Sequence, residues 1–331
     1  MGPTAPDDAG CTGGENGWQG AAIDTAHLRL RPLAEADAAE LCRLLNDWEV
    51  VKSTSNLPFP YRPADADAFI ASAKAEMAAG RAVVCAIEER VGGALLGCVG
   101  ATLAGDSAEI GYWIARAAWG RGLATEAVRR CLRLLFVNFR QNLVWASAMP
   151  GNPASRRVME KVGMTFHQRR PTALPARGVT AELDYLIIDR PAWESRRAAR
   201  PILLVAAAAL IDGDGRVLLC RRPDGKAMAG QWEFPGGKLQ AGETPEAALI
   251  RELAEELGID VTAACLAPLA FASHDYDDFH LLMPLFACRR WHGLPGPREG
   301  QQLAWVRPAR LADYVMPPAD LPLVAILRDW L

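Results

Sequence analysis

Short apolar runs and amphipathic segments alternate along the chain, and their periods predict a mixture of strands and helices. In the first part of the chain, apolar runs predict strands at residues 27–32, 83–87, 94–103, 108–115 and 143–148. Helical spacing of apolar residues predicts helices at residues 35–45, 63–80, 122–139 and 153–162. One more strand follows the last helix, so the order predicts an α+β fold with a mixed, mostly antiparallel sheet.

A second apolar series begins after residues 189–200, a charged, Pro-interrupted stretch that predicts a short linker or a linking helix. It opens with strands at residues 202–211 and 216–222 and continues with a helix from Thr244 and further strands. The length of 331 residues suits two domains, since compact domains usually hold about 100–200 residues. We therefore expect a disordered tail at 1–25, a domain at 26–190, a linker at 191–200 and a domain at 201–331.

Composition excludes several classes of protein. The eight cysteines form no C-x-x-C pair and no metal-binding spacing, so they predict reduced thiols in a cytoplasmic protein. The longest apolar run, residues 201–211, is shorter than the about 20 residues that a membrane helix needs. Residues 1–25 lack the basic start and apolar core of a signal peptide. We expect no membrane association.

Charge is distributed unevenly behind a net charge of −3. Acidic residues outnumber basic ones in residues 201–331, whereas basic residues outnumber acidic ones in residues 26–200. The acidic part suits metal binding, and the basic part suits a phosphorylated ligand. Neither part has the dense Lys/Arg stripe with interleaved aromatic residues that is typical of nucleic-acid-binding proteins. We expect no direct nucleic acid binding.

The helix predicted from Thr244 carries three carboxylates on one face. Thr244 is a suitable N-cap, and Gly258 suits the left-handed stop beyond the last turn. Glu252, Glu255 and Glu256 stand at i, i+3 and i+4, so they are neighbours that repel one another. A hard divalent cation turns that repulsion into ligation. The alternative is a solvated acidic face without a ligand.

The run from Gly237 to Ile259 fills every position of the pattern G-x5-E-x7-R-E-(apolar)-x-E-E-x-G-(apolar). This run resembles the Nudix box, and the resemblance implies a Nudix α/β/α sandwich from about residue 201 onward. It also implies that Mg²⁺ (or Mn²⁺) is held by Glu252, Glu255, Glu256 and the carbonyl group of Gly236. Glu252 or its neighbour Glu255 would accept the proton of the attacking water.

Segments outside the box resemble the MutT-type 8-oxo-dGTP diphosphatases more specifically. They are Arg221-Arg222, Phe234-Pro235-Gly236-Gly237 and the stretch from Met316 to Asp320. The resemblance implies that a nucleoside triphosphate is cleaved to the monophosphate and pyrophosphate. It assigns substrate contacts to these residues: Arg222, Phe234, Pro235, Gly237, Lys238 and Asp320. The alternatives are core packing for Phe234 and a surface charge for Arg222.

Two positions depart from that family's pattern. Asp320 occupies the base-recognition position, where the bacterial prototype has asparagine. If ionised, it can accept a hydrogen bond from the N7–H of oxidised guanine, whereas ordinary guanine presents only a bare N7. A further metal-assisting carboxylate is expected just before Trp305, but Ala304 stands there. Glu299 is the nearest substitute.

In the first part of the chain, the strand at residues 109–114 runs into a glycine-containing loop and then a helix. Gly120 and Gly122 let the backbone approach a ligand, and the first N–H groups of the helix can bind a phosphate. A simple tight turn is the alternative. Further on, the next strand is followed by Asn152-Pro-Ala-Ser155 and then by Lys161-Val-Gly163.

This order resembles the GNAT acetyltransferases, particularly the ribosomal-protein N-acetyltransferase branch, over residues 26–190. The resemblance implies a GNAT fold with helices on both faces of the sheet and acetyl-CoA as co-substrate. It also implies that the strand at 109–114 splays from its neighbour and polarises the thioester carbonyl group. Trp119 departs from the usual Gln or Arg of the loop. The expected cofactor contacts are Trp113, Ile114, Gly120, Arg121, Gly122, Leu123, Ala124, Thr125, Asn152 and Ser155.

Within this resemblance, Glu109 would deprotonate the acceptor amine, and Asn152 would position the cofactor. The alternatives are a strand-edge carboxylate without a role for Glu109 and a turn-forming residue ahead of Pro153 for Asn152. The acetyl acceptor, an amine or a protein N-terminus, is not identified by the sequence.

The leading hypothesis is thus a bifunctional protein that hydrolyses nucleoside triphosphates such as 8-oxo-dGTP and transfers acetyl groups from acetyl-CoA. One alternative keeps the Nudix chemistry but changes the substrate to a CTP-like nucleotide or to CoA. Another makes the GNAT part a non-catalytic module that binds acetyl-CoA.

Overall fold

The computed structural model describes residues 18, 20–223 and 228–331. The chain divides into two compact units between Ala198 and Ala199, and each is described by itself. Most of the expected disordered tail, residues 1–17 and 19, lies outside the described residues. Its end is not disordered, because Ile23–Asp24 forms strand β1 against Arg29 and Leu30.

The first unit is built on one eight-stranded sheet with the order β1-β2-β3-β4-β5-β6-β8-β7. All neighbouring strands are antiparallel except β5 and β6, which are parallel. The sequence prediction of a mixed, mostly antiparallel sheet is therefore confirmed. The strands after β1 are β2 (Leu28–Pro32), β3 (Ala82–Glu89), β4 (Leu95–Ala104), β5 (Ser107–Ile114), β6 (Leu143–Ala148), β7 (Thr165–Leu174) and β8 (Val179–Asp189).

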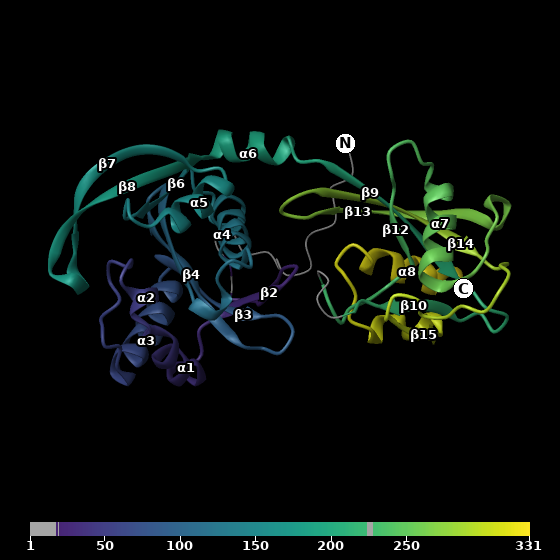
Figure 1. Ribbon diagram of the computed structural model, residues 1–331, viewed down its shortest axis with the longest axis horizontal. Helices are drawn as coiled ribbons and strands as arrows, with labels where there is room; N and C mark the ends of the chain where they lie inside the picture. The colour runs from purple at the N-terminus through teal and green to yellow at the C-terminus, as the bar shows by residue number, and fades with distance from the viewer. Residues whose placement is uncertain (1–17, 19, 224–227) are drawn as a thin grey trace. The chain divides into compact units, whose positions relative to one another are not determined.

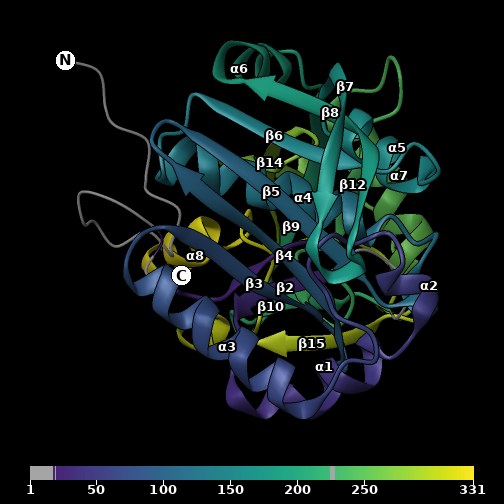
Figure 2. The ribbon, with the colours of Figure 1, turned by 90° about the vertical axis from the view of Figure 1, so that its left-hand side faces the viewer.

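Helices cover both faces of this sheet, as expected for a GNAT fold (Figure 2). One buried cluster joins the sheet to α1 (Ala38–Leu45), α2 (Trp48–Val51) and α3 (Pro63–Ala78). A second joins the opposite face to α4 (Leu123–Arg133) and α5 (Pro153–Lys161). A π-helical turn, Leu134–Asn138, extends α4.

One feature of the first unit differs from the sequence prediction, and in the linker the structure has the linking helix, one of the two predicted alternatives. The single strand predicted after α5 is a hairpin of two strands, β7 and β8. β7 is exposed along most of its length, so its sequence lacks the alternation that marks a half-buried strand. The expected linker is mainly helix α6 (Arg190–Ala198), in which Trp193 stacks on Phe136 with ring centroids 4.9 Å apart.

The second unit contains two sheets and two main helices (Figure 1). One sheet has the order β12 (Gly236–Lys238), β9 (Ile202–Leu210), β14 (His280–Cys288) and β13 (Leu266–Asp275). The other has the order β11 (Trp232–Glu233), β10 (Val217–Arg221) and β15 (Gln302–Val306). Helix α7 (Pro245–Leu257) packs into one buried cluster and α8 (Leu321–Trp330) into another, which gives the expected α/β/α arrangement.

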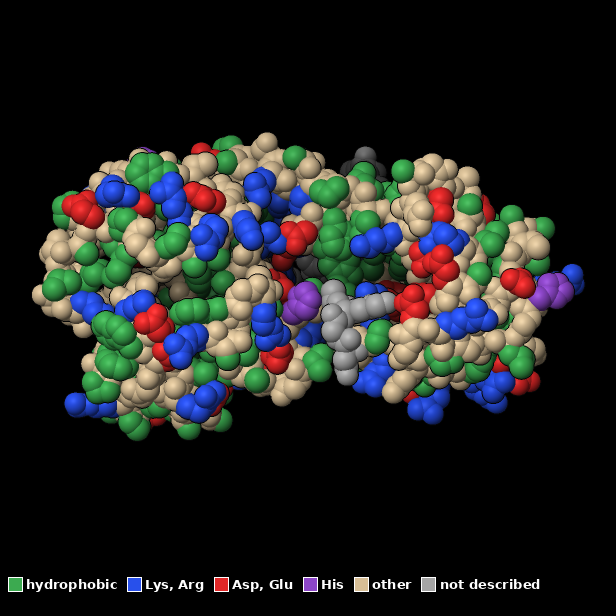
Figure 3. All heavy atoms as spheres, in the orientation of Figure 1, with side chains coloured by type: hydrophobic (Ala, Val, Ile, Leu, Met, Phe, Trp, Pro, Cys, Tyr) green, Lys and Arg blue, Asp and Glu red, His purple; other side chains and the backbone are tan. Residues whose placement is uncertain are grey.

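The surface and the helices add two further observations. Within the described parts of the chain, no helix combines the length and apolar character needed to cross a bilayer. Figure 3 shows acidic and basic side chains interspersed on the visible face of the first unit. Among the ion pairs of this unit are the exposed pairs Arg43–Glu40 and Arg81–Glu76.

Candidate functional site

Helix α7 forms as its local sequence predicts. The Thr244 hydroxyl group accepts a hydrogen bond from the Ala247 N–H at 3.2 Å, and Gly258 ends the helix with φ +68°. Leu249, Leu253 and Leu257 are buried, so the helix turns its apolar side to the core. Its glutamates are left on the sides that lie toward the β12 loop and toward solvent.

The Glu252 carboxyl group lies directly against the glycine-rich loop. A Cβ atom placed on Gly237 would lie 2.1 Å from Glu252 Cδ, and one on Gly236 would lie 2.1 Å from the carbonyl oxygen of Ala206. Gly236 also has φ +148°, a conformation that residues with a side chain rarely adopt. The structure thus brings Gly236, Gly237 and Glu252 together. Only glycine fits at position 236, where backbone atoms crowd the site, whereas a side chain at position 237 would displace the Glu252 carboxyl group.

Arg251 joins the loop to the acidic helix. Its guanidinium group bonds Glu243 at 2.9 and 3.0 Å, Glu252 at 2.7 Å and Glu255 at 3.2 Å. The pKa of Glu243 is lowered to about 2, with the hydrogen bonds from Arg251 as the main cause and that from the Gln240 N–H as the second. Sequence reasoning did not assign Arg251 a role, although it occupies a fixed position of the motif.

The three glutamates do not converge on one point. Glu252 and Glu255 both bond Arg251. The pKa of the Cys220 thiol on β10 is raised mainly by burial and in part by the charge of Glu256, so Glu256 lies on the side of α7 toward β10. Across the described residues, no group of three or more Asp, Glu, His or Cys side chains is arranged to hold a metal ion. The oxygen donors suit a hard divalent cation, but binding one requires the side chains of Glu255 and Glu256 to turn toward Glu252.

The residues expected to contact the base form a second, adjoining cluster. Phe234 and Asp320 are both buried, at 4% exposure each, and the Phe234 N–H donates to the Asp320 carboxyl group. Arg222 Nη1 lies 2.5 Å from Glu233 Oε2, and the charges of both residues act on Asp320. Sequence reasoning missed Glu233 and also Tyr276, whose pKa is raised by burial and by the charge of Asp320.

Asp320 has a carboxyl group whose pKa is raised to about 8. Burial is the largest cause and the Glu233 charge the second, while the Phe234 N–H and Arg222 lower the pKa in part. The carboxyl group is therefore mostly protonated at neutral pH. The hydrogen bonding considered from the sequence assumed an ionised Asp320, whereas its burial beside Glu233 favours the protonated form.

The remaining predicted residues of this unit lie around the same loop. Pro235 accepts the Ala208 N–H through its carbonyl oxygen, and Lys238 is an exposed residue at the end of β12. Ala304 lies in β15 opposite Leu219. Glu299 donates its N–H to Gln301, whose side chain bonds the carbonyl oxygen of Glu256. Glu299 thus lies in a segment that is hydrogen-bonded to the end of α7 through Gln301.

The first unit shows the strand divergence that the resemblance implies. β5 pairs with β6 only from Ser107 to Glu109, so the backbone edge of the rest of β5 is open on that side. Trp113 and Ile114 pair with β4 on the other side. The Trp119 indole N–H donates to the Ile114 carbonyl oxygen at 2.7 Å, which fixes the start of the loop at the end of this strand.

The loop after β5 presents backbone N–H groups at the start of α4. Gly120 and Gly122 adopt φ +75° and +81°, and no side chain caps the helix at Gly122. The N–H groups of Leu123, Ala124 and Thr125 in the first turn therefore lack a capping side chain and remain suited to an anion. Arg121 points toward β3, where it pairs with Glu89 at 2.5 Å.

Asn152 and Ser155 lie at the start of α5. Asn152 Oδ1 accepts the Ser155 N–H at 3.1 Å, so it caps the helix in the way of a turn-forming residue. The Ser155 hydroxyl group lies 2.8 Å from the Tyr112 hydroxyl group on β5. The sequence did not identify Tyr112 as a site residue, because its contact with Ser155 depends on how the fold places the start of α5 beside β5.

Glu109 lies where β5 and β6 begin to diverge and pairs with Trp145. Desolvation by the surrounding protein raises the pKa of Glu109, and the charge of Arg170 lowers it in part. A carboxylate with a raised pKa is a better proton acceptor, which suits the predicted role of a base.

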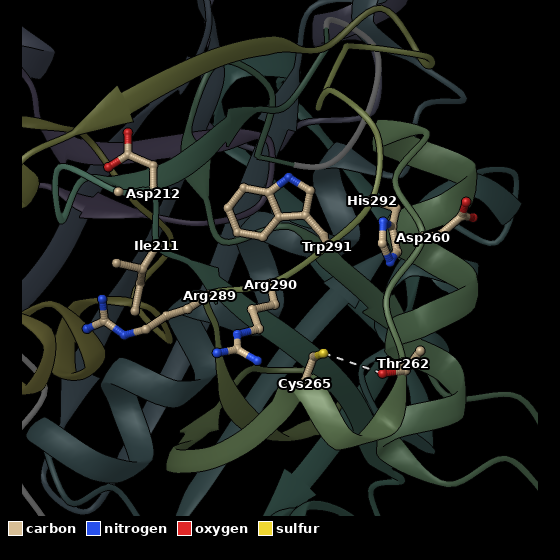
Figure 4. A pocket seen from close by; sticks show the side chains of 10 residues that line it. Ile211, Asp212, Asp260, Thr262, Cys265, Arg289, Arg290, Trp291 and His292 are labelled. Atoms are coloured by element: carbon tan, nitrogen blue, oxygen red, sulfur yellow. Dashed lines mark hydrogen bonds between the residues drawn. The ribbon is translucent and has the colours of Figure 1, made fainter.

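A separate cavity of ≈ 570 Å³ lies in the second unit (Figure 4). It is lined by the end of β9, the segment after α7 and residues 289–292, and the described lining includes none of the residues predicted from the sequence as site residues. In Figure 4 the Arg289 and Arg290 side chains extend to the same side, while the Asp260 carboxyl group points away. This cavity is therefore distinct from the cluster around Gly237 and Glu252.

Comparisons with known proteins match the two units separately. The acetyltransferase (GNAT) domain model matches residues 27–165, and the NUDIX domain model matches residues 206–325. A CTP pyrophosphohydrolase of Escherichia coli is 38% identical over 124 residues, which cover 37% of this chain and 89% of the relative. An 8-oxo-dGTP diphosphatase of Proteus vulgaris is 46% identical over 89 residues, covering 27% and 78%.

Among solved structures, an acetyltransferase (GNAT family) from Bacillus anthracis is similar with a TM-score of 0.46 and 20% identity. The match covers 51% of this chain and 98% of that structure.

Proposed function

Because the chain belongs to the Nudix family in its second unit and carries a GNAT acetyltransferase domain in its first, we propose a bifunctional enzyme. The second unit hydrolyses oxidised nucleoside triphosphates such as 8-oxo-dGTP to the monophosphate and pyrophosphate in a reaction that depends on Mg²⁺ or Mn²⁺. The first unit transfers an acetyl group from acetyl-CoA to an amine.

One loop carries the main support for the hydrolase. At its start, the N–H of Phe234 donates to Asp320, and three residues on, Gly237 packs against Glu252. A nucleotide with its base beside Phe234 and Asp320 therefore has its phosphates near Glu252 and Lys238. The same segment thus links base recognition to the acidic helix.

The metal ligands proposed are the Gly236 carbonyl group and the carboxylates of Glu252, Glu255 and Glu256. A bound divalent cation neutralises charge on the phosphates and lowers the pKa of the attacking water. Glu252 accepts the proton of that water, since its carboxylate is held at the loop by Gly237 and Arg251. Arg251 also offsets the repulsion between the glutamates while the site holds no cation.

A protonated Asp320 explains how aspartate replaces asparagine at the base. A carboxylic acid has one O–H donor and one carbonyl acceptor, the same pair that an amide side chain offers. Oxidised guanine presents the N7–H donor beside the O6 acceptor, so the acid accepts from the first and donates to the second. Ordinary guanine has no N7–H and leaves one of these bonds unmade, which costs roughly 1–3 kcal/mol for a buried group.

A CTP-like nucleotide is the second candidate substrate. One relative of the second unit is named a CTP pyrophosphohydrolase. Cytosine presents the N4–H donor beside the N3 acceptor, which a protonated Asp320 also complements. CoA, whose adenine is also a flat base, is the third candidate substrate.

For acetyl transfer, the support lies in the open edge of β5 and the N–H groups at residues 120–125. The pyrophosphate of acetyl-CoA binds these N–H groups, and the thioester lies along Trp113 and Ile114. Ser155 lies beside the thioester, Asn152 orders the start of α5, and Glu109 accepts the proton of the amine. The alternative, an acetyl-CoA-binding module without turnover, predicts binding without release of CoA.

Hydrolysis of a nucleotide panel with Mg²⁺ tests the hydrolase assignment. The panel contains 8-oxo-dGTP, dGTP, CTP, dCTP and acetyl-CoA, and the products are identified by chromatography. We expect the highest kcat/KM for 8-oxo-dGTP, with pyrophosphate as co-product. A higher kcat/KM for CTP would assign the second candidate, and cleavage of acetyl-CoA alone would overturn both.

A further inference from the structure

Four side chains project from one face of the first unit's sheet beside the open edge of β5. Glu109 on β5 is paired with Trp145 on β6, and Tyr185 on β8 is paired with Ser147, two residues after Trp145. Arg170 on β7 is paired with Leu183, two residues before Tyr185. Residues opposite each other, or two apart on a strand, point to the same face. Glu109, Trp145, Tyr185 and Arg170 therefore form one row across four strands.

Aromatic rings fill the centre of this row. The Trp145 and Tyr185 rings lie 5.6 Å apart, and Arg170 Cζ lies 4.1 Å from the centre of the Tyr185 ring. The Thr172 hydroxyl group bonds the Tyr185 hydroxyl group at 2.8 Å and fixes the ring. The guanidinium group is thus held flat on an ordered platform by a cation–π contact.

Arg170 has donors to spare. Within the described residues it makes no hydrogen bond through its side chain and no ion pair, although its charge acts on Glu109. The neighbouring Arg169 differs, because it bonds Asp184 at 2.6 Å. There is also room for a ligand, since a Cβ atom on Gly111 of β5 would meet no atom within 4 Å.

A carboxylate and a guanidinium group at the two ends of an aromatic platform complement a molecule with an amine at one end and an anion a few bonds away. We propose that the acetyl acceptor is a primary amine with a carboxylate beside it, and that Arg170 binds this carboxylate while the amine lies at Glu109. A peptide N-terminus followed by an acidic residue has this chemistry, as does a free amino acid. The inference rests on the acetyl transfer proposed above.

The test measures CoA release by the full chain with acetyl-CoA and four acceptors. Three are C-terminally amidated peptides, Ser-Glu-Glu-Ala, Ser-Gln-Gln-Ala and Ser-Lys-Lys-Ala, and the fourth is free glutamate. We expect kcat/KM to be about tenfold higher for the acidic peptide than for the neutral one, mainly through KM, as for a charge-assisted hydrogen bond. Turnover of free glutamate at a similar rate would extend the acceptor class to amino acids.

Variants identify the residue responsible. Arg170→Gln should abolish the preference for the acidic peptide, and Arg170→Glu should transfer it to the lysine peptide. Arg43→Gln is the control, because it removes the same charge from an exposed position paired with Glu40. Equal kcat/KM for all peptides in the wild type, or a preference that survives in Arg170→Gln, overturns the inference.

Failure of the proposed acetyl transfer gives a different result. In that case no CoA is released from acetyl-CoA with any of the acceptors. The binding of the same peptides to the CoA-bound chain, measured by calorimetry, then decides the inference. Tighter binding of the acidic peptide that is lost in Arg170→Gln supports recognition by Arg170. Equal binding of the acidic and neutral peptides overturns it.

Discussion

Gly237 and Glu252 are packed so closely that a single Cβ atom on the glycine would lie 2.1 Å from Cδ of the glutamate. The carboxyl group cannot keep its place if residue 237 has a side chain. The position of Glu252 therefore depends on the missing side chain at Gly237 as well as on its bond to Arg251.

Gly237→Ala should lower kcat for nucleotide hydrolysis by at least about tenfold, because it displaces the carboxylate proposed to accept the proton of the attacking water. Gly213→Ala is the matched control, since a Cβ atom there meets nothing within 4 Å and its φ is not in the glycine-favoured region. Steady-state kinetics with Mg²⁺ would show the contrast. Equal kcat in the two variants would mean that the contact has no catalytic importance.

Glu255→Gln and Glu256→Gln should each lower hydrolysis by at least about a hundredfold, because each removes a charge from the proposed metal site. Acetyl-CoA binding should not change, which calorimetry of the same samples would verify. If both variants hydrolyse nucleotides at near-normal rates, the acidic helix is not the metal site.

The stability of the second unit should fall as pH rises from about 4 to about 8. The Asp320 carboxyl group has its pKa raised from 3.8 to about 8 by burial and by Glu233, so the folded state keeps a proton that the unfolded chain releases in this range. The stabilisation is full below about pH 4 and is lost as pH passes the folded pKa. Denaturant unfolding of wild type and Asp320→Asn between pH 5 and pH 9 measures this.

The asparagine side chain of the Asp320→Asn variant does not titrate. The free energy of unfolding of this variant should therefore vary less with pH than that of the wild type. Arg222, Glu233 and Tyr276 face residue 320 in both proteins, so the difference between the two pH profiles reports the Asp320 carboxyl group together with its interaction with Glu233. Identical pH dependence in the two proteins would show that Asp320 is already ionised in the folded state.

Residues 1–198 and 199–331 should each fold alone, because each unit has its own sheet and buried clusters. The cut should follow α6, since Trp193 of this helix stacks on Phe136 of the first unit. Circular dichroism would establish folding, and the fragments should separately bind acetyl-CoA and hydrolyse nucleotides. A second fragment that is inactive while the full chain is active would contradict this.

Local signals explain which parts of this structure could be predicted from the sequence. Helix α7 was predicted to within a residue because its cap, Thr244, and its stop, Gly258, lie next to it in the chain. The loop around Gly120 and Gly122 was predicted for the same reason. β7 was missed, because an exposed edge strand has no apolar face to reveal it.

The state of Asp320 could not be predicted, since it depends on residues far away in the sequence. Glu233 and Phe234 come from the loop before the acidic helix, and Tyr276 follows β13. The same holds for Arg170, which meets Tyr185 only through the β7–β8 hairpin. Sequence patterns identified the residue types at these sites, but burial and neighbouring charges depend on the fold.

The most direct test of the account is kcat/KM for 8-oxo-dGTP and for dGTP, measured at pH 7 with Mg²⁺ for the wild type and Asp320→Ala. One unmade buried hydrogen bond costs roughly 1–3 kcal/mol, so the wild type should prefer 8-oxo-dGTP by about ten- to a hundredfold. The preference should fall to near one in Asp320→Ala. An unchanged ratio in the variant, or no preference in the wild type, would contradict the assignment of Asp320 as the residue that recognises oxidised guanine.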